Sequence, residues 1–271
     1  MTAPLDVLHL EIHVAHACNL QCESCSHYSD QGHKGVVSLE DAEAWMSAWS
    51  SRIRPQTFSL VGGEPTLHPK LPDFMRLARS QWPGAVLRLV TNGFFLHKHP
   101  GLLDVLRGDE KAEIYLSLHH RSDEYLGAIQ ANHDLLQGWQ RDYGIRAFRY
   151  DSFGDWRRTH HGSGASMLPY RDGRPRESWE HCKARYSPQL FEARVWKCAP
   201  LAYLGMQNAR YGLAKDWEPY LAYRPLQPGC SDEALREFFG REQDPECGMC
   251  PARPERLALP MPLVRRAKRA S

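Results

Sequence analysis

Three cysteines offer the clearest chemistry in this chain. Cys18, Cys22 and Cys25 are spaced C-x3-C-x2-C within the run HACNLQCESCSHYSD. Three thiolates on one short loop can bind three irons of a [4Fe–4S] cube, which leaves the fourth iron open for chemistry. The alternative is a zinc knuckle, because zinc takes four Cys or His ligands and His16 and His27 flank the loop. The spacing alone leaves both open, a reactive cluster and a structural zinc site.

A second motif follows a short apolar stretch. Residues 57–61 read as a strand that runs into Gly62-Gly63-Glu64-Pro65. Paired glycines let the backbone approach a ligand closely, because no side chain stands in the way. Glu64 follows the carboxyl end of this strand, which is where open α/β sheets bind ligands. Taken alone, the same residues also suit an ordinary turn between a strand and a helix.

Together, these two motifs resemble those of the radical S-adenosylmethionine (SAM) superfamily. That family has its C-x3-C-x2-C loop directly after the first strand, and its Gly-Gly-Glu motif after the second strand binds the amino group of SAM. A third match is LVTNG at residues 89–93, which places Asn92 among the cofactor-binding residues. The resemblance covers residues 7–155 and implies a [4Fe–4S] cluster with SAM bound at its open iron.

The resemblance also implies contacts to the rest of SAM. The family commonly places a polar residue at the end of the fourth strand, near the ribose, where this chain has Ser117 and His119. One position departs from the pattern. The residue before the third cysteine is usually aromatic and lies near the adenine, but here it is Ser24. Tyr28 or His27 is expected to make the adenine contact instead.

A second group of cysteines lies near the end of the chain. Cys182 precedes a hairpin-like stretch that ends at Cys198, and Cys247 and Cys250 form a C-x-x-C. Four thiolates suit either a fully ligated [4Fe–4S] cluster or a four-cysteine zinc site. The layout resembles the twitch domain, a shortened SPASM domain that carries an auxiliary [4Fe–4S] cluster. Cys230 is not needed for this pattern. The alternative is that Cys230 replaces Cys182 as the fourth ligand of the cluster.

The pattern of the chain predicts an α/β fold in which strands and helices alternate. Ser38 is the expected N-cap of the first helix, with Asp41 three residues later. Such alternation builds a parallel sheet, and we expect a partial (β/α)6-type barrel with a small C-terminal twitch-like domain. The expected strands span residues 8–14, 57–61, 86–90, 114–118 and 145–150, and the expected helices span residues 38–54, 69–81, 100–106 and 123–143.

These elements suggest four successive parts: a barrel core over residues 1–155, a connecting loop over 156–180, an auxiliary-cluster domain over 181–255 and a basic tail over 256–271. The connecting loop is rich in cations, namely Arg157, Arg158, His160 and His161. It is either a solvated loop or a substrate-binding loop over the barrel mouth.

Composition is consistent with one core and a small appendage in a cytoplasmic protein. The chain has 271 residues, 42% of them hydrophobic, and a net charge of +2, which gives no argument for a nucleic-acid partner. Its start lacks the features of a signal peptide, and no run approaches the ~20 apolar residues that span a bilayer. Eight cysteines in such a chain indicate metal ligands in a reducing compartment.

The expected reaction is an oxidation. In the radical SAM family, cleavage of SAM yields a 5′-deoxyadenosyl radical that takes a hydrogen atom from substrate, and a second cluster gives the remaining electron somewhere to go. Size and layout resemble aminocyclitol dehydrogenases of natural-product biosynthesis, which favours a small polyol, sugar or cyclitol as substrate. An electron donor such as flavodoxin or ferredoxin is the expected partner. Arg149 and Asp151, at the end of the fifth strand, are candidates to bind hydroxyls or take the hydroxyl proton, unless they form only a surface ion pair.

Three other functions remain open at this point. One is radical modification of a peptide or amino acid, in which a crosslink or thioether is formed. Another is a redox-neutral radical rearrangement, decarboxylation or elimination with a merely structural second cluster. The third is a non-catalytic metal-binding protein.

Overall fold

A single sheet organises the molecule. The computed structural model of the chain describes residues 3–263, and its strands follow the order β5-β4-β3-β2-β1-β6-β7. All neighbouring pairs are parallel except β6 with β7. The strands are β1 (Leu5–Ala15), β2 (Ile53–Gly62), β3 (Val86–Thr91), β4 (Ala112–Leu118), β5 (Arg146–Asp151), β6 (Gln189–Phe191) and β7 (Arg194–Trp196).

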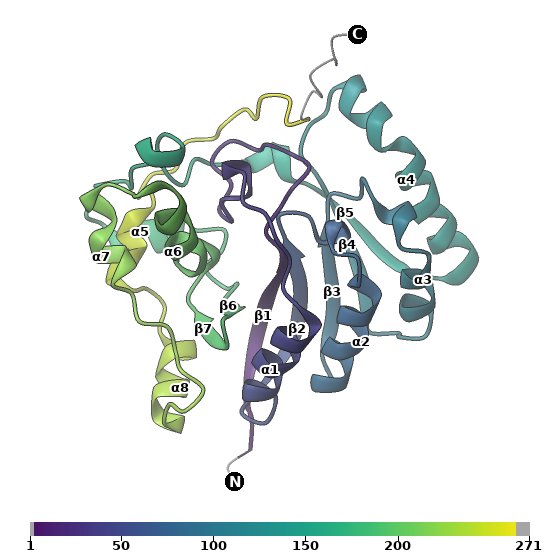
Figure 1. Cartoon of the computed structure of the whole chain (residues 1–271), viewed down its shortest axis with the longest axis horizontal. Helices are drawn as coiled ribbons and strands as arrows, with labels where there is room; N and C mark the ends of the chain where they lie inside the picture. Colours follow the sequence, from purple (N-terminus) through teal and green to yellow (C-terminus); the bar gives the residue numbers. More distant parts are fainter. Residues whose placement is uncertain (1–2, 264–271) are drawn as a thin grey trace.

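The helices fall into two groups (Figure 1). Helices α1 to α4 connect and cover strands β1 to β5, whereas α5 to α8 gather beside β6 and β7. This arrangement is the α/β partial barrel that the sequence predicts. The helices are α1 (Leu39–Ser50), α2 (Leu71–Gln81), α3 (Pro100–Arg107), α4 (Asp123–Tyr143), α5 (Pro175–Glu180), α6 (Ala199–Tyr211), α7 (Glu218–Leu221) and α8 (Asp232–Gly240).

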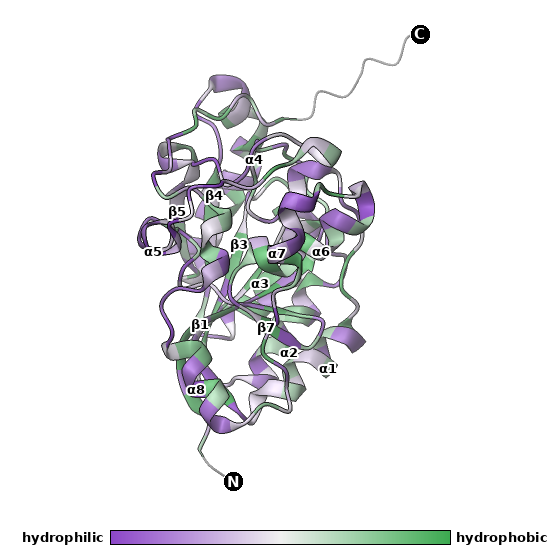
Figure 2. Ribbon diagram, turned by 90° about the vertical axis from the view of Figure 1, so that its left-hand side faces the viewer, coloured by the Kyte–Doolittle hydropathy of each residue, from purple (hydrophilic) through white to green (hydrophobic). Residues whose placement is uncertain are grey.

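The two faces of the sheet differ in chemistry. Leu10, Ile12, Phe58, Leu60 and Leu89 are fully buried and belong to the main apolar core. Figure 2 shows that hydrophobic residues concentrate in these central strands. The opposite face carries a polar row, a set of residues held in register from β6 to β5: Gln189, Glu11, Ser59, Arg88, Glu113 and Arg146. The polar row lies beneath the functional site described below.

The start of α1 is as predicted, but its end is not. The Ser38 hydroxyl accepts a hydrogen bond from the Asp41 backbone N–H at 2.9 Å, which confirms the N-cap. The helix ends at Ser50 rather than Arg54, and β2 begins at Ile53. Proline restricts the residue before it to extended backbone, so Pro55 keeps Arg54 in the strand.

The predicted hairpin around Cys198 joins the central sheet. Strands β6 and β7 pair antiparallel, and β6 also pairs parallel with β1. The auxiliary segment therefore shares its sheet with the barrel strands. The basic tail expected over 256–271 lies partly outside the described residues, from 264 onward. Among helices within residues 3–263, none is both long and apolar enough to cross a membrane.

Candidate functional site

A cavity at the carboxyl ends of β1 to β4 collects most of the predicted cofactor residues. We call it the first cavity. The three loop cysteines, the Gly-Gly-Glu motif and residues from three strand ends share it: Cys18, Cys22, Cys25, Gly62, Gly63, Glu64, Asn92, Ser117 and His119. His27, Asp30, Ser152, Trp156 and the strand residue Glu11 also line it. Segments far apart in the sequence therefore form one site.

The loop that carries Cys18, Cys22 and Cys25, here called the cluster loop, holds its three thiols close together in a largely buried place. Burial raises the pKa of Cys25 to about 11 and raises those of Cys18 and Cys22 further, and the nearby Cys25 thiolate adds to the shifts of both Cys18 and Cys22. Among the described residues that line the cavity, there is no lysine or arginine. Three thiolates can therefore be ionised here only with bound cations, and the irons of a [4Fe–4S] cluster meet that need.

Within residues 3–263, no group of three or more His, Cys, Asp or Glu side chains is arranged to hold a single metal ion.

The paired glycines have a role that the sequence did not indicate. A Cβ on Gly62 would lie 2.7 Å from the Ala15 carbonyl oxygen, and one on Gly63 would lie 2.3 Å from the Ala17 carbonyl oxygen. The Gly63 N–H donates to the Ala15 carbonyl at 2.7 Å. The glycines thus let the end of β2 pack against the start of the cluster loop, and they line the cavity from that position.

Glu64 is almost completely buried and held rigidly. Its Oε1 accepts hydrogen bonds from the Thr66 N–H at 2.9 Å and from the Thr66 and Thr91 hydroxyls at 2.5 Å each. Its Oε2 accepts one from the Asn92 N–H at 2.7 Å, which leaves this oxygen further accepting capacity. Burial raises the pKa of Glu64 in spite of these bonds. A cationic ligand such as an ammonium group would favour its ionised form.

The side chains of the remaining predicted cofactor residues at this cavity contact the cluster loop or a neighbouring serine. The Asn92 side-chain amide donates to the Asn19 side chain at 2.8 Å. The Ser117 hydroxyl lies 2.5 Å from that of Ser152. His119 Nδ1 lies 3.5 Å from Cys22 Sγ, and burial lowers the pKa of His119 to about 4, so its imidazole is neutral near pH 7.

Tyr28 does not line this cavity. Its backbone is left-handed and its side chain is 1% exposed. It belongs to a second apolar cluster, which includes Phe191, Tyr203 and Trp217. Its hydroxyl donates a hydrogen bond to the Pro200 carbonyl at 3.2 Å. Of the two residues expected near the adenine, only His27 lies at the cavity.

Arg149 and Asp151 also lie away from it. They lie opposite Leu116 and Leu118 of β4 in the strand register, so their side chains are on the face of β5 opposite to that of Tyr150. The two side chains form an exposed ion pair with each other at 2.8 Å. They therefore match the surface ion pair given as the alternative.

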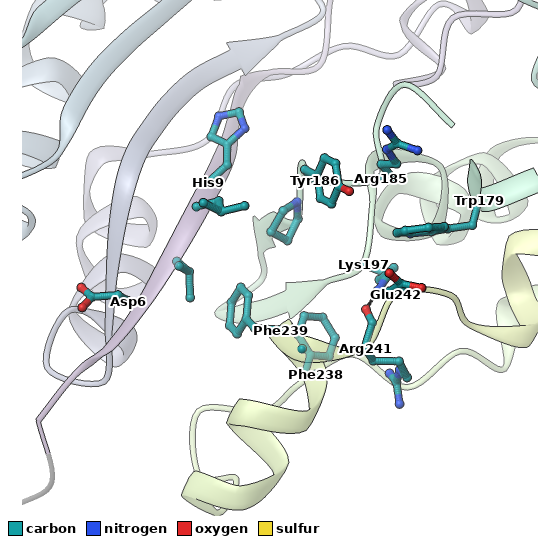
Figure 3. A pocket seen from close by; sticks show the side chains of 14 residues that line it. Asp6, His9, Trp179, Arg185, Tyr186, Lys197, Phe238, Phe239, Arg241 and Glu242 are labelled. Atoms are coloured by element: carbon teal, nitrogen blue, oxygen red, sulfur yellow. Dashed lines mark hydrogen bonds between the residues drawn. The ribbon is translucent and has the colours of Figure 1, made fainter. Parts of the chain in front are cut away.

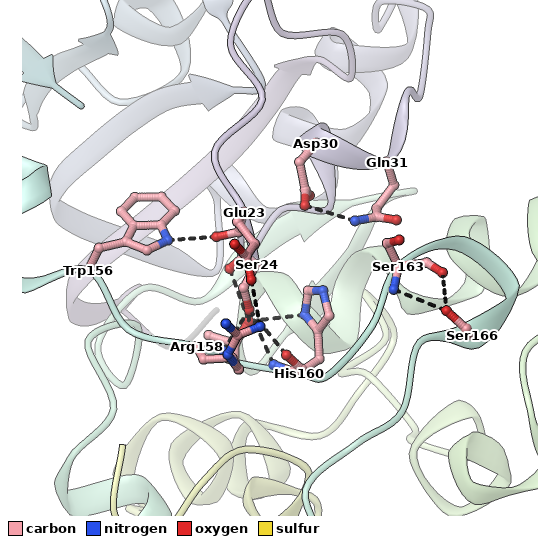
Figure 4. Close-up of polar contacts among 10 residues, drawn as sticks. Glu23, Ser24, Asp30, Gln31, Trp156, Arg158, His160, Ser163 and Ser166 are labelled. Atoms are coloured by element: carbon pink, nitrogen blue, oxygen red, sulfur yellow. Dashed lines mark hydrogen bonds and ion pairs between the residues drawn. The ribbon is translucent and has the colours of Figure 1, made fainter. Parts of the chain in front are cut away.

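Ser24 binds the connecting loop to the cluster loop (Figure 4). Its hydroxyl accepts a hydrogen bond from the Thr159 N–H at 2.8 Å. On either side, the Trp156 indole N–H donates to the Glu23 carbonyl at 2.8 Å and Arg158 forms a 2.6 Å ion pair with Glu23. A bulky aromatic residue at position 24 has no room for this role, which accounts for the departure from the family pattern.

The four auxiliary cysteines come together from three places in the chain. Burial raises the pKa of Cys250, and the nearby thiolates of Cys182, Cys198 and Cys247 raise it further. Cys230 lies apart from them, where its sulfur accepts a hydrogen bond from Arg52 at 3.3 Å. The structure therefore brings Cys182, rather than Cys230, to the other three.

A second cavity adjoins the first and reaches two of the auxiliary cysteines. Cys182 and Cys250 line it together with Arg157 and Arg158 of the connecting loop. Ser26, Ser152 and Trp156 line both this cavity and the first. None of these three was identified from the sequence, and the place of Trp156 depends on how the connecting loop folds back.

Comparison with known proteins agrees with this geometry. The family model described as the Radical SAM superfamily matches residues 12–140. GTP 3',8-cyclase of Shewanella denitrificans is 30% identical over 93 residues, covering 34% of this chain and 27% of the cyclase. A 7,8-dihydro-6-hydroxymethylpterin dimethyltransferase of Methanocaldococcus jannaschii is 33% identical over 127 residues, covering 45% of this chain and 24% of that protein. The chain thus spans about a quarter of the length of these relatives.

A solved structure shares the fold over nearly the whole chain. BtrN in complex with AdoMet and 2-DOIA superposes with a TM-score of 0.50 at 16% identity and covers 88% of both chains. The cysteine loop, the Gly-Gly-Glu motif and strands β2 to β4 lie within the residues that the family model matches. Residues 12–140 are therefore identified as similar to the radical SAM superfamily, in agreement with the geometry of the site.

Proposed function

We propose that this protein is a radical SAM dehydrogenase that oxidises a secondary alcohol of a small polyol, sugar or cyclitol to a ketone. One observation carries the proposal: Ser26, Ser152 and Trp156 line both cavities, so the cavity at the cluster loop adjoins the cavity that reaches the auxiliary cysteines Cys182 and Cys250, and the two together are called the recess. A substrate in that recess lies between a group that removes a hydrogen atom and a group that accepts an electron.

In this proposal the first cavity binds the cofactors. Cys18, Cys22 and Cys25 hold a [4Fe–4S] cluster, and Glu64 accepts a hydrogen bond from the SAM ammonium. The reduced cluster and SAM together supply a 5′-deoxyadenosyl radical. Asn92 fixes the cluster loop through Asn19, which keeps the cysteines in place.

Ser117, His119 and His27 complete the SAM site. Ser117 presents a hydroxyl at the ribose side, held by Ser152. His119 is neutral and lies against Cys22, so it adds no positive charge beside the cationic sulfonium. Trp156 lines both cavities of the recess and limits the access of water, which would quench radical chemistry.

The auxiliary cysteines hold a second [4Fe–4S] cluster in this account. Cys182, Cys198, Cys247 and Cys250 would supply four thiolates; burial raises the pKa of Cys182, Cys198 and Cys247, and the nearby Lys197 ammonium opposes that shift in all three. When bound, such a cluster would accept the electron left on the substrate. A flavodoxin or ferredoxin supplies the electron that starts the reaction, and residues 181–255 act as the auxiliary-cluster part of the chain.

The test removes only the second cluster. Cys247→Ala with Cys250→Ala should lower the iron content from about eight to about four per chain after anaerobic reconstitution. SAM cleavage should persist, but ketone formation from cyclitols should be lost because the electron has no acceptor. Cys230→Ala is the matched control and should retain about eight irons. Stable zinc with four irons in the wild type, or wild-type oxidation by the double variant, would overturn the proposal.

A further inference from the structure

Glu11 is a buried carboxyl group at the first cavity that none of the roles above uses. It lies in the polar row on β1, and its side chain is only 12% exposed. Its Oε2 accepts a hydrogen bond from the Gln189 side-chain amide at 2.6 Å, and the Gln189 oxygen accepts one from the Tyr203 hydroxyl at 2.8 Å. These contacts fix the carboxyl group, while one oxygen, Oε1, remains for another partner.

That partner is His9, which opens onto a different cavity. His9 Nε2 lies 3.5 Å from Glu11 Oε1 and 2.7 Å from the Ser59 hydroxyl. His9 also lines a third cavity, enclosed by β1, the segment before β6, and the end of α8 (Figure 3). Glu11 and His9 therefore join the first cavity to the third through two adjacent side chains.

Burial disfavours charge on both members of this pair. Burial raises the pKa of Glu11 to about 7, although hydrogen bonds from Gln189 and Ser187 and the charge of Arg88 oppose the shift. Burial and Arg88 lower the pKa of His9 to about 4, so the His9 imidazole is neutral near pH 7. Arg88 itself is paired with Glu113 at 2.8 Å, and the Tyr203 phenol is neutral because burial raises its pKa.

We infer that Glu11 accepts the hydroxyl proton of the substrate and that His9 passes it to water in the third cavity. This inference rests on the proposed function. Loss of a hydrogen atom from the carbon leaves a carbon radical that bears the hydroxyl group. The O–H bond then breaks and the C=O bond forms, as the proton goes to the Glu11 carboxylate and one electron goes to an oxidised four-iron cluster at the auxiliary cysteines. His9, neutral with its own proton on Nδ1, accepts the proton from Glu11 at Nε2 as Nδ1 gives up its proton to solvent, which restores the carboxylate.

The first measurement needs no substrate. In the reconstituted full chain, infrared difference spectra between pH 6 and pH 8 should show a carboxylic acid C=O band that titrates near pH 7. Glu11→Gln should abolish this band, whereas Glu43→Gln, an exposed control on α1, should leave it unchanged. The absence of the band, or its persistence in Glu11→Gln, would overturn the inference.

The second measurement follows turnover on a panel of myo-inositol, scyllo-inositol, glucosamine and ribitol. Wild-type ketone formation should rise with pH through about 7. Glu11→Gln should form ketone about 100-fold more slowly and lose this pH dependence, with SAM binding unchanged. His9→Gln should keep its first turnover but slow about tenfold in later ones, because Glu11 cannot discharge its proton.

The outcomes separate the inference from the proposed function. If the wild type oxidises a panel member and Glu11→Gln does so at the same rate, the Glu11 role is wrong and the dehydrogenase stands. If the wild type cleaves SAM but oxidises no alcohol in the panel, the dehydrogenase falls, and with it the proton route.

Discussion

Two buried glutamates at the first cavity have different surroundings, and these give them different tasks. Glu64 accepts hydrogen bonds from two backbone N–H groups and two hydroxyls, so its position is fixed for binding a cation. Glu11 accepts from the Gln189 amide and from Ser187 and has a neutral histidine beside it, and burial raises its pKa to about 7, so it can gain and lose a proton near neutral pH. The same side chain thus serves binding at one position and proton transfer at the other.

Replacing Glu64 by Gln should weaken SAM binding without loss of iron. The amide is neutral, and a charge-assisted hydrogen bond is roughly twice as strong as a neutral one. One N–H of the new amide would also face a donor, either the Asn92 N–H or the Thr66 and Thr91 hydroxyls. We expect Kd for SAM to rise about tenfold or more, measured by calorimetry on the reconstituted protein. Asp151→Asn, which changes an exposed carboxylate outside the cavity, should leave Kd unchanged; equal effects in both variants would contradict the assignment.

Glu11 should also make stability depend on pH. Folding raises its pKa from an ordinary value of 4.5 to about 7, so the protonated form is favoured by folding. Its contribution is fully present below about pH 4.5 and is lost as the pH rises through about 7. At pH 8.5 the free energy of unfolding of Glu11→Gln, measured by urea denaturation, should therefore exceed that of the wild type by about 3 kcal/mol. At pH 5 the two free energies should differ little. A difference independent of pH would show that Glu11 does not titrate in this range.

At the scale of elements, local sequence predicted the strands well but not which way their side chains face. All five predicted strands occur, and α4 has its predicted bounds. Arg149 and Asp151 do end a strand, but Leu116 and Leu118, their partners on β4, show that they lie on its other face. The face depends on register with β4, which the sequence of β5 alone does not specify.

Other parts of the site depended on contacts between distant segments. Tyr28 has left-handed backbone and lies buried away from the first cavity. Trp156 lines the cavity and donates its indole N–H to the Glu23 carbonyl in the cluster loop. The alternation of His9, Glu11 and His13 with Leu10 and Ile12 in β1 was a usable signal, since charged side chains at alternate positions of a buried strand call for a partner or a function.

The junction of β2 with the cluster loop gives a test at this scale. Gly63→Ala would place a Cβ 2.3 Å from the Ala17 carbonyl oxygen, which forces the cluster loop to move. We expect reconstituted protein to lose about four irons and SAM cleavage while the auxiliary cluster remains. Gly84→Ala, where a Cβ meets nothing within 4 Å, is the matched control. Full iron content and SAM cleavage in Gly63→Ala would contradict the packing described here.

At the scale of the whole molecule, one sheet supports both cysteine groups. Strand β1 lies beside β2 on one side and β6 on the other, and the chain after β6 and β7 supplies Cys198 at the start of α6. The barrel and the auxiliary segment are therefore joined through one sheet and not only through the connecting loop. This continuity places the recess between two groups of thiolates, which is the basis of the proposed two-electron oxidation.

The most direct test of that oxidation is the ratio of 5′-deoxyadenosine to ketone in one reaction, with substrate deuterated at the oxidised carbon. The account predicts one 5′-deoxyadenosine per ketone, with the deuterium found in the 5′-deoxyadenosine, because SAM is consumed as an oxidant. Regeneration of SAM during turnover, or ketone that forms without deuterium transfer, would contradict it.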